Sequence, residues 1–295
     1  MISTWLRAIR IRFLLASVVA VSAGLSITWW HTGSITILDA ILTICGVLAL
    51  HASVDLLNDY WDFKRGIDTA TQRTKMSGGS GVLPDGLLKP TQVYAAGIIF
   101  LVIGALIGVY FVISDGIIIG IILAFAVISI YFYSTKIVNW GLAEVFVTIK
   151  GSMIVIGTYF VQTQQITESV VLCGIIIGVL SSLVLFITSF PDHDADKAKG
   201  RKTLVISLGK QRACSILWVF PTIAYGISIV SVVFEIFPLS CLIILVTIPL
   251  IIKSGYKLKQ NYEQLANLIP AMNSTLYFSR ITGALLVVGF LVNVG

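Results

Sequence analysis

Nine long apolar runs constrain the fold of this 295-residue chain more than any other feature of its sequence. A helix needs about 20 apolar residues to cross the hydrocarbon core of a bilayer, and lipid offers no partner to an unpaired backbone group. We therefore predict membrane-spanning helices over residues 12–30, 35–58, 91–113, 116–134, 141–161, 169–189, 211–234, 238–253 and 271–294. Only 12% of the residues are charged, against about 25% in soluble domains. The sequence thus predicts an all-α integral membrane protein with about nine transmembrane helices, forming a single domain over residues 1–295.

The positions of the basic residues predict how the helices are oriented. Cytoplasmic connections of membrane proteins are enriched in Lys and Arg. If the N-terminus is cytoplasmic, the connections expected on the outer side, near His31, Asp115, Gln165 and Glu235, contain no basic residue. We therefore expect a multi-pass protein of the cell membrane whose long connections, residues 59–90 and 191–210, form an active site facing the cytoplasm. The formal net charge of +6 is explained by this topology, so no nucleic-acid partner is expected.

Two acidic clusters follow the second and sixth apolar runs, in the stretches NDYWDFKRGID (residues 58–68) and DHDADKAKG (residues 192–200). Each cluster places two oxygen-bearing side chains four residues apart, on one face of a helix. Asn58 and Asp62 match Asp192 and Asp196 at one constant offset, 134 residues (192 minus 58 and 196 minus 62). The spacing predicts two four-helix halves, each with one cluster, followed by a ninth helix.

Hard oxygen ligands in two such clusters favour Mg²⁺, which binds one or two carboxylates together with phosphate oxygens of a substrate. The metal would convert repulsion between the carboxylates and a diphosphate into attraction, and nearby basic side chains would neutralise the remaining charge. One cluster alone is also typical of a solvated helix end. Two clusters at matching positions favour a metal-diphosphate site.

The paired clusters resemble the aspartate-rich motifs of the UbiA-type intramembrane prenyltransferases. The stretch YSTKIVNWGLAE, residues 133–144, and the number of helices extend the resemblance over most of the chain. The resemblance implies Mg²⁺-dependent transfer of a prenyl group from an isoprenyl diphosphate to a lipophilic, aromatic or lipid acceptor within the bilayer. The form of the first motif and the stretch GGSGVLPDGLL, residues 78–88, are similar to the branch that prenylates 1,4-dihydroxy-2-naphthoate for menaquinone.

The resemblance also implies which residues bind metal. These are Asn58, Asp62, Asp192 and Asp196, with Asp59 and Asp68 as helpers. We expect Asp62, Asp192, Asp196 and Lys136 to be catalytic. Diphosphate contacts are expected from basic residues near the two clusters or within the spans, namely Lys64, Arg65, Arg73, Lys75, Lys136, Lys150, Lys199 and Arg201.

Four further residues are candidates for the pocket that holds the acceptor and the prenyl chain. His51 and Asp55 lie on the same helix face as the first cluster, where they could bind the acceptor's hydroxyl or pair with another helix. Tyr131 and Tyr133 could stabilise a cation through their rings, although aromatic residues are common at any membrane interface. Lys150 lies inside a predicted span, which favours a role against the diphosphate or an acidic acceptor.

Other functions remain open from the sequence. A secondary transporter would also contain repeats and charged residues in helices, but its coupling residues should lie near the midplane, and here the clusters lie at helix ends. A lipid-binding protein would tolerate amide substitution of the aspartates. Among prenyltransferases, geranylgeranylglyceryl phosphate and 4-hydroxybenzoate are the alternative acceptors.

Overall fold

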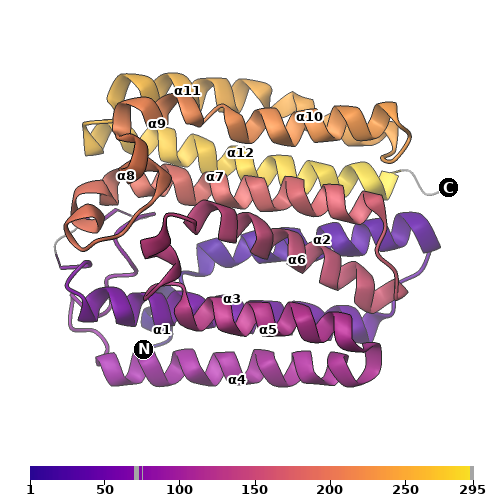
Figure 1. Cartoon of the computed structure of the whole chain (residues 1–295), viewed down its shortest axis with the longest axis horizontal. Coiled ribbons are helices and arrows are strands. Elements are labelled where there is room, and N and C mark those ends of the chain that lie inside the picture. Colours follow the sequence, from indigo (N-terminus) through magenta and orange to yellow (C-terminus); the bar gives the residue numbers. More distant parts are fainter. Residues whose placement is uncertain (70–72, 75, 293–295) are drawn as a thin grey trace.

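The computed structural model describes residues 1–69, 73–74 and 76–292, and within these residues it contains helices and no strand. The long helices run side by side in one bundle, and the connections gather at its two ends (Figure 1). The prediction of an all-α protein is confirmed.

Eight helical segments of the described chain are long and apolar enough to cross a membrane. They are α2 (Ile11–Thr32), α3 (Ile37–Lys64), α4 (Pro90–Asp115), α6 (Ala143–Thr163), α7 (Glu168–Ala198), α9 and α10 (Lys210–Val233), η2 and α11 (Leu239–Asn261) and α12 (Leu265–Val292). The ninth predicted span is α5 (Ile117–Phe132), with 16 residues. At 1.5 Å per residue it is about 24 Å long, so it is shorter than the hydrocarbon core of a typical bilayer. The chain is thus a multi-span membrane protein with all nine predicted segments helical.

The two helices that carry the acidic clusters extend further than their apolar runs predict. α3 has 28 residues and ends at Lys64, and α7 has 31 residues and ends at Ala198. The predicted ends, at residues 58 and 189, were too early because the polar side chains of the clusters find partners in the connections and the helical backbone continues through them. Both clusters therefore lie on the last turns of long helices.

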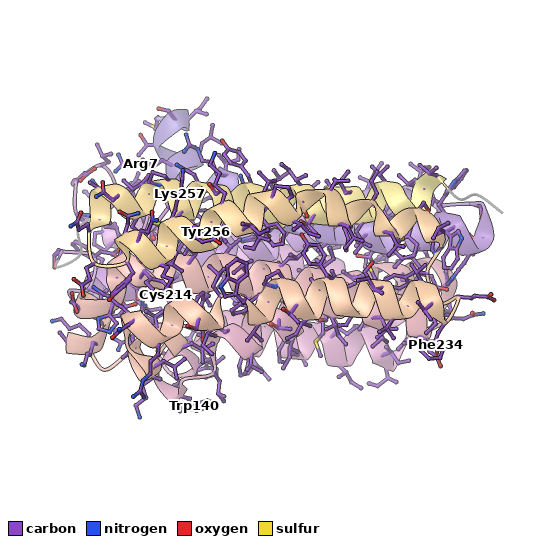
Figure 2. The ribbon with its side chains drawn as sticks, turned by 90° about the horizontal axis from the view of Figure 1, so that it is seen from above. Arg7, Trp140, Cys214, Phe234, Tyr256 and Lys257 are labelled. Carbon is purple, nitrogen blue, oxygen red and sulfur yellow. The ribbon has the colours of Figure 1, made fainter. Side chains whose placement is uncertain are left out.

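Short elements at one end of the bundle had no signal in the sequence. They are α1 (Ile2–Ala8), the 3₁₀ helix η1 (Ile137–Trp140) and α8 (Leu204–Leu208), while α9 (Lys210–Ile216) and α10 (Val219–Val233) divide one predicted span. The Arg7 guanidinium of α1 donates to the Ser80 carbonyl at 2.8 Å and to the Asp85 carboxylate at 2.7 Å. Figure 2 places Arg7, Trp140 and Lys257 toward one end of the bundle and Phe234 at the opposite end, in keeping with the predicted alternation of connections.

Small residues allow the central helices to pack closely, as is common between membrane helices. α7 lies between α12 and α6 in Figure 1, and it contacts both. A Cβ atom at Gly178 of α7 would lie 2.1 Å from the Thr148 carbonyl oxygen of α6. The core continues along α7 through fully buried Leu183, Phe186 and Phe190. This packing fixes α7 relative to its neighbours and so fixes the position of the second acidic cluster.

Candidate active site

The structure brings the two acidic clusters together at one end of the bundle. Asn58 and Asp62 of α3 and Asp192 and Asp196 of α7 line a single cavity. Asp68, from the connection after α3, lines the same cavity. We call it the acidic cavity.

The four helical ligand candidates have different partners. The Asn58 Oδ1 atom accepts a hydrogen bond from the Ser134 hydroxyl at 2.5 Å. The buried Asp62 and Asp196 carboxylates both pair with Arg201, whose guanidinium lies 3.1 Å from Asp196 and also contacts Asp62. The Asp192 Oδ2 atom accepts a hydrogen bond from the Gly78 amide at 3.2 Å. Its Oδ1 atom is buried and has no hydrogen-bond partner among the described residues. Asp192 therefore keeps an oxygen available for a ligand.

Asp59 and Asp68 have separate roles in the fold. Asp59 is 1% exposed, and its two carboxylate oxygens lie 3.1 and 3.2 Å from the Ser80 amide. It anchors the glycine-rich loop and does not line the acidic cavity. Asp68 does line that cavity. Burial, followed by the carboxylates of Asp62 and Asp59, raises the pKa of Asp68 to about 8.

The glycine-rich loop lies against the carboxylates. Gly78, Gly79 and Gly81 have φ of 76°, 70° and 76°, a region that residues with a Cβ atom rarely adopt. A Cβ atom at Gly79 would lie 2.7 Å from Asp68 Oδ2. The glycines thus let the loop backbone close over the cavity and present the Gly78 amide to Asp192.

Most of the basic residues predicted to bind diphosphate do not line the acidic cavity. Of those that the structure describes, Arg201 lines the acidic cavity and Lys150 lines deeper cavities. Exposed Lys64 lies over the rings of Tyr60 and Trp61, and exposed Lys136 lies over Phe132. Lys75 falls outside the described residues.

The other three predicted basic residues lie in the connections. Arg65 donates to the carbonyls of Ser134, at 2.6 Å, and Lys199, at 3.0 Å. Arg73 forms an ion pair of 3.0 Å with Asp85, and the Lys199 side chain is exposed. Arg65 and Arg73 thus link segments of the connections to one another. Neither residue lines the acidic cavity.

Arg10 is a site residue that the sequence did not single out. It lies between α1 and α2 with φ of 48°, and it lines both the acidic cavity and the deeper cavity beside it. Its guanidinium donates to the Met76 carbonyl at 3.2 Å. The sequence shows Arg10 as one of three arginines before the first span, and no local pattern distinguishes it from Arg7 or Arg12.

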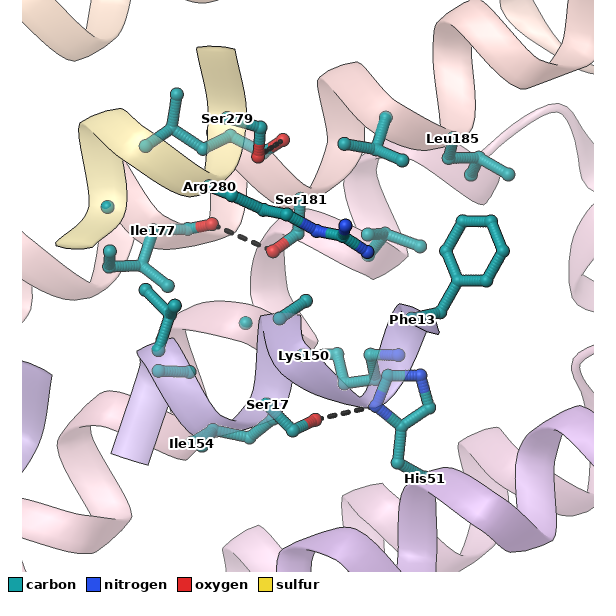
Figure 3. Close-up of a pocket in the computed structure, with 18 of the residues that line it drawn as sticks. Phe13, Ser17, His51, Lys150, Ile154, Ile177, Ser181, Leu185, Ser279 and Arg280 are labelled. Carbon is teal, nitrogen blue, oxygen red and sulfur yellow. Dashed lines mark hydrogen bonds between the residues drawn. The ribbon is translucent and has the colours of Figure 1, made fainter. Parts of the chain in front are cut away.

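The deeper cavity lies between α2, α3, α6, α7 and α12 and is lined by Ser17, His51, Asp55 and Lys150 among others (Figure 3). We call it the inner cavity. The His51 Nδ1 and Ser17 Oγ atoms are 2.6 Å apart, and His51 Nε2 lies 3.8 Å from Asp55 Oδ2.

The two predicted pocket tyrosines lie differently. The side chain of Tyr133 lines the acidic cavity and a pocket shared with His51 and Asp55. Tyr131 is 37% exposed and lies on the outer surface. Only Tyr133 is in a position to contact a ligand that extends from one cavity to the other.

Residues 17–276 match the UbiA prenyltransferase family. The chain belongs to that family. It is 27% identical over 284 residues to the 1,4-dihydroxy-2-naphthoate octaprenyltransferase of Bacillus subtilis (strain 168), covering 95% of this chain and 89% of that protein. It is 24% identical over 303 residues to the enzyme of the same name from Escherichia coli (strain K12), covering 97% of this chain and 94% of that protein. The resemblance seen in the motifs is confirmed.

Solved structures of the UbiA family share the fold. A UbiA homolog from Aeropyrum pernix K1 superposes with a TM-score of 0.70 at 16% identity, covering 95% of this chain and 97% of that one. A UbiA homolog from Archaeoglobus fulgidus, bound to GPP and Mg²⁺, superposes with a TM-score of 0.63 at 15% identity, covering 96% and 99%. The helical arrangement described above is therefore the UbiA fold.

The acidic cavity suits a hard divalent cation. No group of three His, Cys, Asp or Glu within the described ranges is arranged to hold a metal by itself. Mg²⁺ does not require such a group, since it takes one or two carboxylates and completes its shell with waters and phosphate oxygens. The buried, unpartnered Oδ1 of Asp192 and the oxygen donors of Asn58, Asp62, Asp68 and Asp196 meet that requirement.

Proposed function

We propose that this protein transfers a prenyl group from an isoprenoid diphosphate to 1,4-dihydroxy-2-naphthoate or a closely similar hydroxylated aromatic acid. The observation that carries the proposal is the convergence of Asn58 and Asp62 with Asp192 and Asp196 on one cavity, directly beside the inner cavity. The family supports prenyl transfer, and the names of the relatives from B. subtilis and E. coli support the acceptor.

Asn58, Asp62, Asp68, Asp192 and Asp196 would hold Mg²⁺ in the acidic cavity. When bound, the metal supplies Lewis-acid stabilisation of the negative charge that develops on the departing diphosphate.

The chain's own groups bind the diphosphate beside the carboxylates. Arg10 and Arg201 line the acidic cavity, and guanidinium groups form strong, charge-assisted hydrogen bonds to phosphate oxygens. The bond between the allylic carbon and the diphosphate oxygen breaks, and its electron pair leaves with the diphosphate. The ring of Tyr133, which lines the acidic cavity and the pocket that it shares with His51 and Asp55, stabilises the positive charge on the allylic carbon.

The acceptor ring then donates an electron pair and forms the new carbon–carbon bond. The attacked ring carbon loses the group that it carried, which is a proton taken up by water or, at a carboxylated carbon, CO₂, and the electron pair of the broken bond returns to the ring. His51 and Asp55 line the cavity next to this point, and Asp55 holds the acceptor's hydroxyl, which increases the electron density of the ring.

We place the acidic cavity on the cytoplasmic side of the membrane. The connections at this end include Lys64, Arg65, Arg73, Lys136 and Lys199, and the excess of basic residues in cytoplasmic connections supports this orientation. Thiol labelling of single cysteines introduced near Lys199 and near Glu235, in cells that lack other exposed thiols, tests it. Labelling of the cysteine near Lys199 by a membrane-impermeant reagent in intact cells would contradict the proposed orientation.

Asp192→Asn tests the function itself. Purified protein in nanodiscs is given Mg²⁺, a prenyl diphosphate and each of three acceptors, a dihydroxynaphthoate, 4-hydroxybenzoate and a glycerol-phosphate lipid, and products are identified by mass. We expect a prenylated naphthoate from the wild type and a fall in turnover of about 100-fold or more in Asp192→Asn, by analogy with the loss of other charge-stabilising groups.

A matched control is Asp39→Asn, in the first turn of α3, which should keep full turnover. Chelation of divalent metal should abolish turnover in the wild type. Full activity in both Asp192→Asn and Asp62→Asn, or activity that survives chelation, would contradict the proposal.

A further inference from the structure

The inner cavity carries an unbalanced positive charge. Its lining includes three basic side chains, those of Arg10, Lys150 and Arg280, and one carboxylate, that of Asp55. Most of the remaining wall is apolar, with Phe13 on one side. Charged groups within a membrane-spanning region are costly unless they face a partner or a ligand, so this cavity favours a ligand that carries negative charge.

Lys150 is the cation without a partner in this cavity. It lies seven residues after Ala143, the first residue of α6, which is about two turns into the helix. Its amino group donates no hydrogen bond and joins no ion pair within the part of the chain that the structure describes. A half-buried ammonium group that lines a cavity and keeps all its donors free is ready to bind an anion.

Arg280 reaches the same space from another helix. It belongs to α12, and its guanidinium also donates to the Arg12 carbonyl. Figure 3 shows the Lys150 and Arg280 side chains extending into the cavity toward Phe13. An anionic group between them would be bound by two donors from opposite walls.

The wall formed by α3 contains a hydrogen-bond acceptor instead of cations. His51 is occupied by Ser17, at 2.6 Å, whereas the buried Asp55 Oδ2 accepts no hydrogen bond from the described residues. A hydroxyl donor would satisfy this oxygen. The ligand that fits the whole cavity is therefore a flat aromatic molecule with an anionic group near Lys150 and a hydroxyl near Asp55.

The inner cavity also adjoins the acidic cavity. Arg10, Leu185 and Thr188 line both, so a ligand in the inner cavity lies next to the diphosphate in the acidic cavity. The sequence left two anions open for Lys150, the diphosphate and an acidic acceptor. Lys150 lines the inner cavity and is absent from the lining of the acidic cavity, which favours the acceptor.

We infer that the inner cavity is the acceptor subsite, in which Lys150, assisted by Arg280, binds the acceptor's carboxylate while Asp55 accepts a hydrogen bond from its hydroxyl. The inference rests on the proposed function. It makes Lys150 the residue that selects an aromatic acid over its uncharged analogue.

Equilibrium binding tests the inference without turnover. The probes are 1-hydroxy-2-naphthoate and 1-hydroxy-2-naphthamide, which share shape and hydroxyl and differ in charge. Their dissociation constants are measured by titration calorimetry on the purified full-length protein in detergent. We expect the wild type to bind the carboxylate at least about tenfold more tightly, since a hydrogen bond to a charged group contributes roughly 1.5–3 kcal/mol.

Lys150→Met keeps the length of the side chain and removes its charge. We expect this variant to bind the carboxylate about 10- to 100-fold more weakly and the amide about as well as the wild type. Lys150→Arg should restore part of the preference. Lys253→Met is the matched control, a lysine in α11 outside both cavities, and should leave both affinities unchanged.

Three results would overturn the inference. They are equal wild-type affinity for the two probes, equal weakening of both probes in Lys150→Met, and weakening of prenyl diphosphate binding in that variant with the probe preference retained. Failure of the proposed function gives a different result, because the wild type would keep its preference for the carboxylate probe and form no prenylated product. The anion-binding role of Lys150 would then stand alone.

Discussion

The Gly79→Ala substitution tests whether the backbone of the glycine-rich loop positions a carboxylate of the acidic cavity. Gly79 has φ of 70°, and a Cβ atom there would lie 2.7 Å from Asp68 Oδ2. Two effects follow. An L residue in the left-handed region costs about 1–2 kcal/mol, and the Asp68 carboxylate must move away by about 0.7 Å, from 2.7 Å to the 3.4 Å of ordinary contact.

The two effects have different consequences for the measured quantities. The backbone strain lowers the free energy of unfolding and should reduce the melting temperature by a few degrees. The displacement moves Asp68, a proposed metal ligand that lines the acidic cavity, and a misplacement of about 1 Å can cost about 100-fold in rate. We therefore expect turnover to fall at least about tenfold and the Mg²⁺ concentration for half-maximal turnover to rise.

Gly86→Ala separates these effects. Gly86 has φ of 67°, and a Cβ atom there would have no neighbour within 4 Å. It should reproduce the loss of stability, measured by thermal unfolding in detergent, and keep wild-type turnover and Mg²⁺ dependence. If turnover depends on the Mg²⁺ concentration in the same way in both variants, the contact between Gly79 and Asp68 does not position a metal ligand. That result would refute the reasoning.

Two other predictions concern packing and pH. Gly178→Ala would place its Cβ atom 2.1 Å from the Thr148 carbonyl oxygen, so the backbones of α6 and α7 must separate. We expect the free energy of unfolding, measured by thermal unfolding, to fall by at least about 2 kcal/mol. Unchanged stability would show that the two helices move apart freely. Hydrogen bonds from Arg7 and then Arg73 lower the pKa of Asp85 from its ordinary value of 3.8. A lowered pKa in the folded state stabilises the protein above the ordinary pKa, and the contribution is lost as the pH falls through the lowered value. Limited proteolysis with an acid-active protease should thus release α1 more readily as the pH falls below 3.8. Asp85→Asn should release α1 equally above and below that pH, and a wild-type pattern in Asp85→Asn would show that this ion pair does not hold α1.

The spans and the pairing of the clusters could be predicted from the sequence because both follow from simple periodic rules. Long apolar runs must be helices in lipid, and residues four apart share a helix face. Asn58, Asp62, Asp192 and Asp196 therefore had to lie on two helix faces, and their meeting required only that α3 and α7 end on the same side of the bundle. The structure shows that they do.

The assignment of the basic residues was harder because position along the chain does not give direction around a helix. Lys64 is two residues after Asp62, which places it on roughly the opposite side of α3. It lies over surface aromatic rings while Asp62 faces the cavity.

Asp59 and Asp68 show a second limit of the sequence. The sequence gives no reason to prefer either as a ligand, and a contact 21 residues away, from the Ser80 amide to Asp59, separates their roles. Such a choice depends on the path of the loop, which tertiary contacts determine.

The position of Arg10, between the acidic cavity and the inner cavity, fits the different requirements of the two substrates. The diphosphate requires the metal and guanidinium groups of the acidic cavity, and the aromatic acceptor requires the mostly apolar walls of the inner cavity. In the proposed reaction the new carbon–carbon bond forms where the two cavities meet, and the residues common to both linings are Arg10, Leu185 and Thr188. Arg10 is the charged member of this set, so in the proposed reaction it would face both the leaving diphosphate and the attacking acceptor. A left-handed residue between α1 and α2, outside both aspartate motifs, thereby becomes part of the site, because the break between the two helices turns its side chain inward.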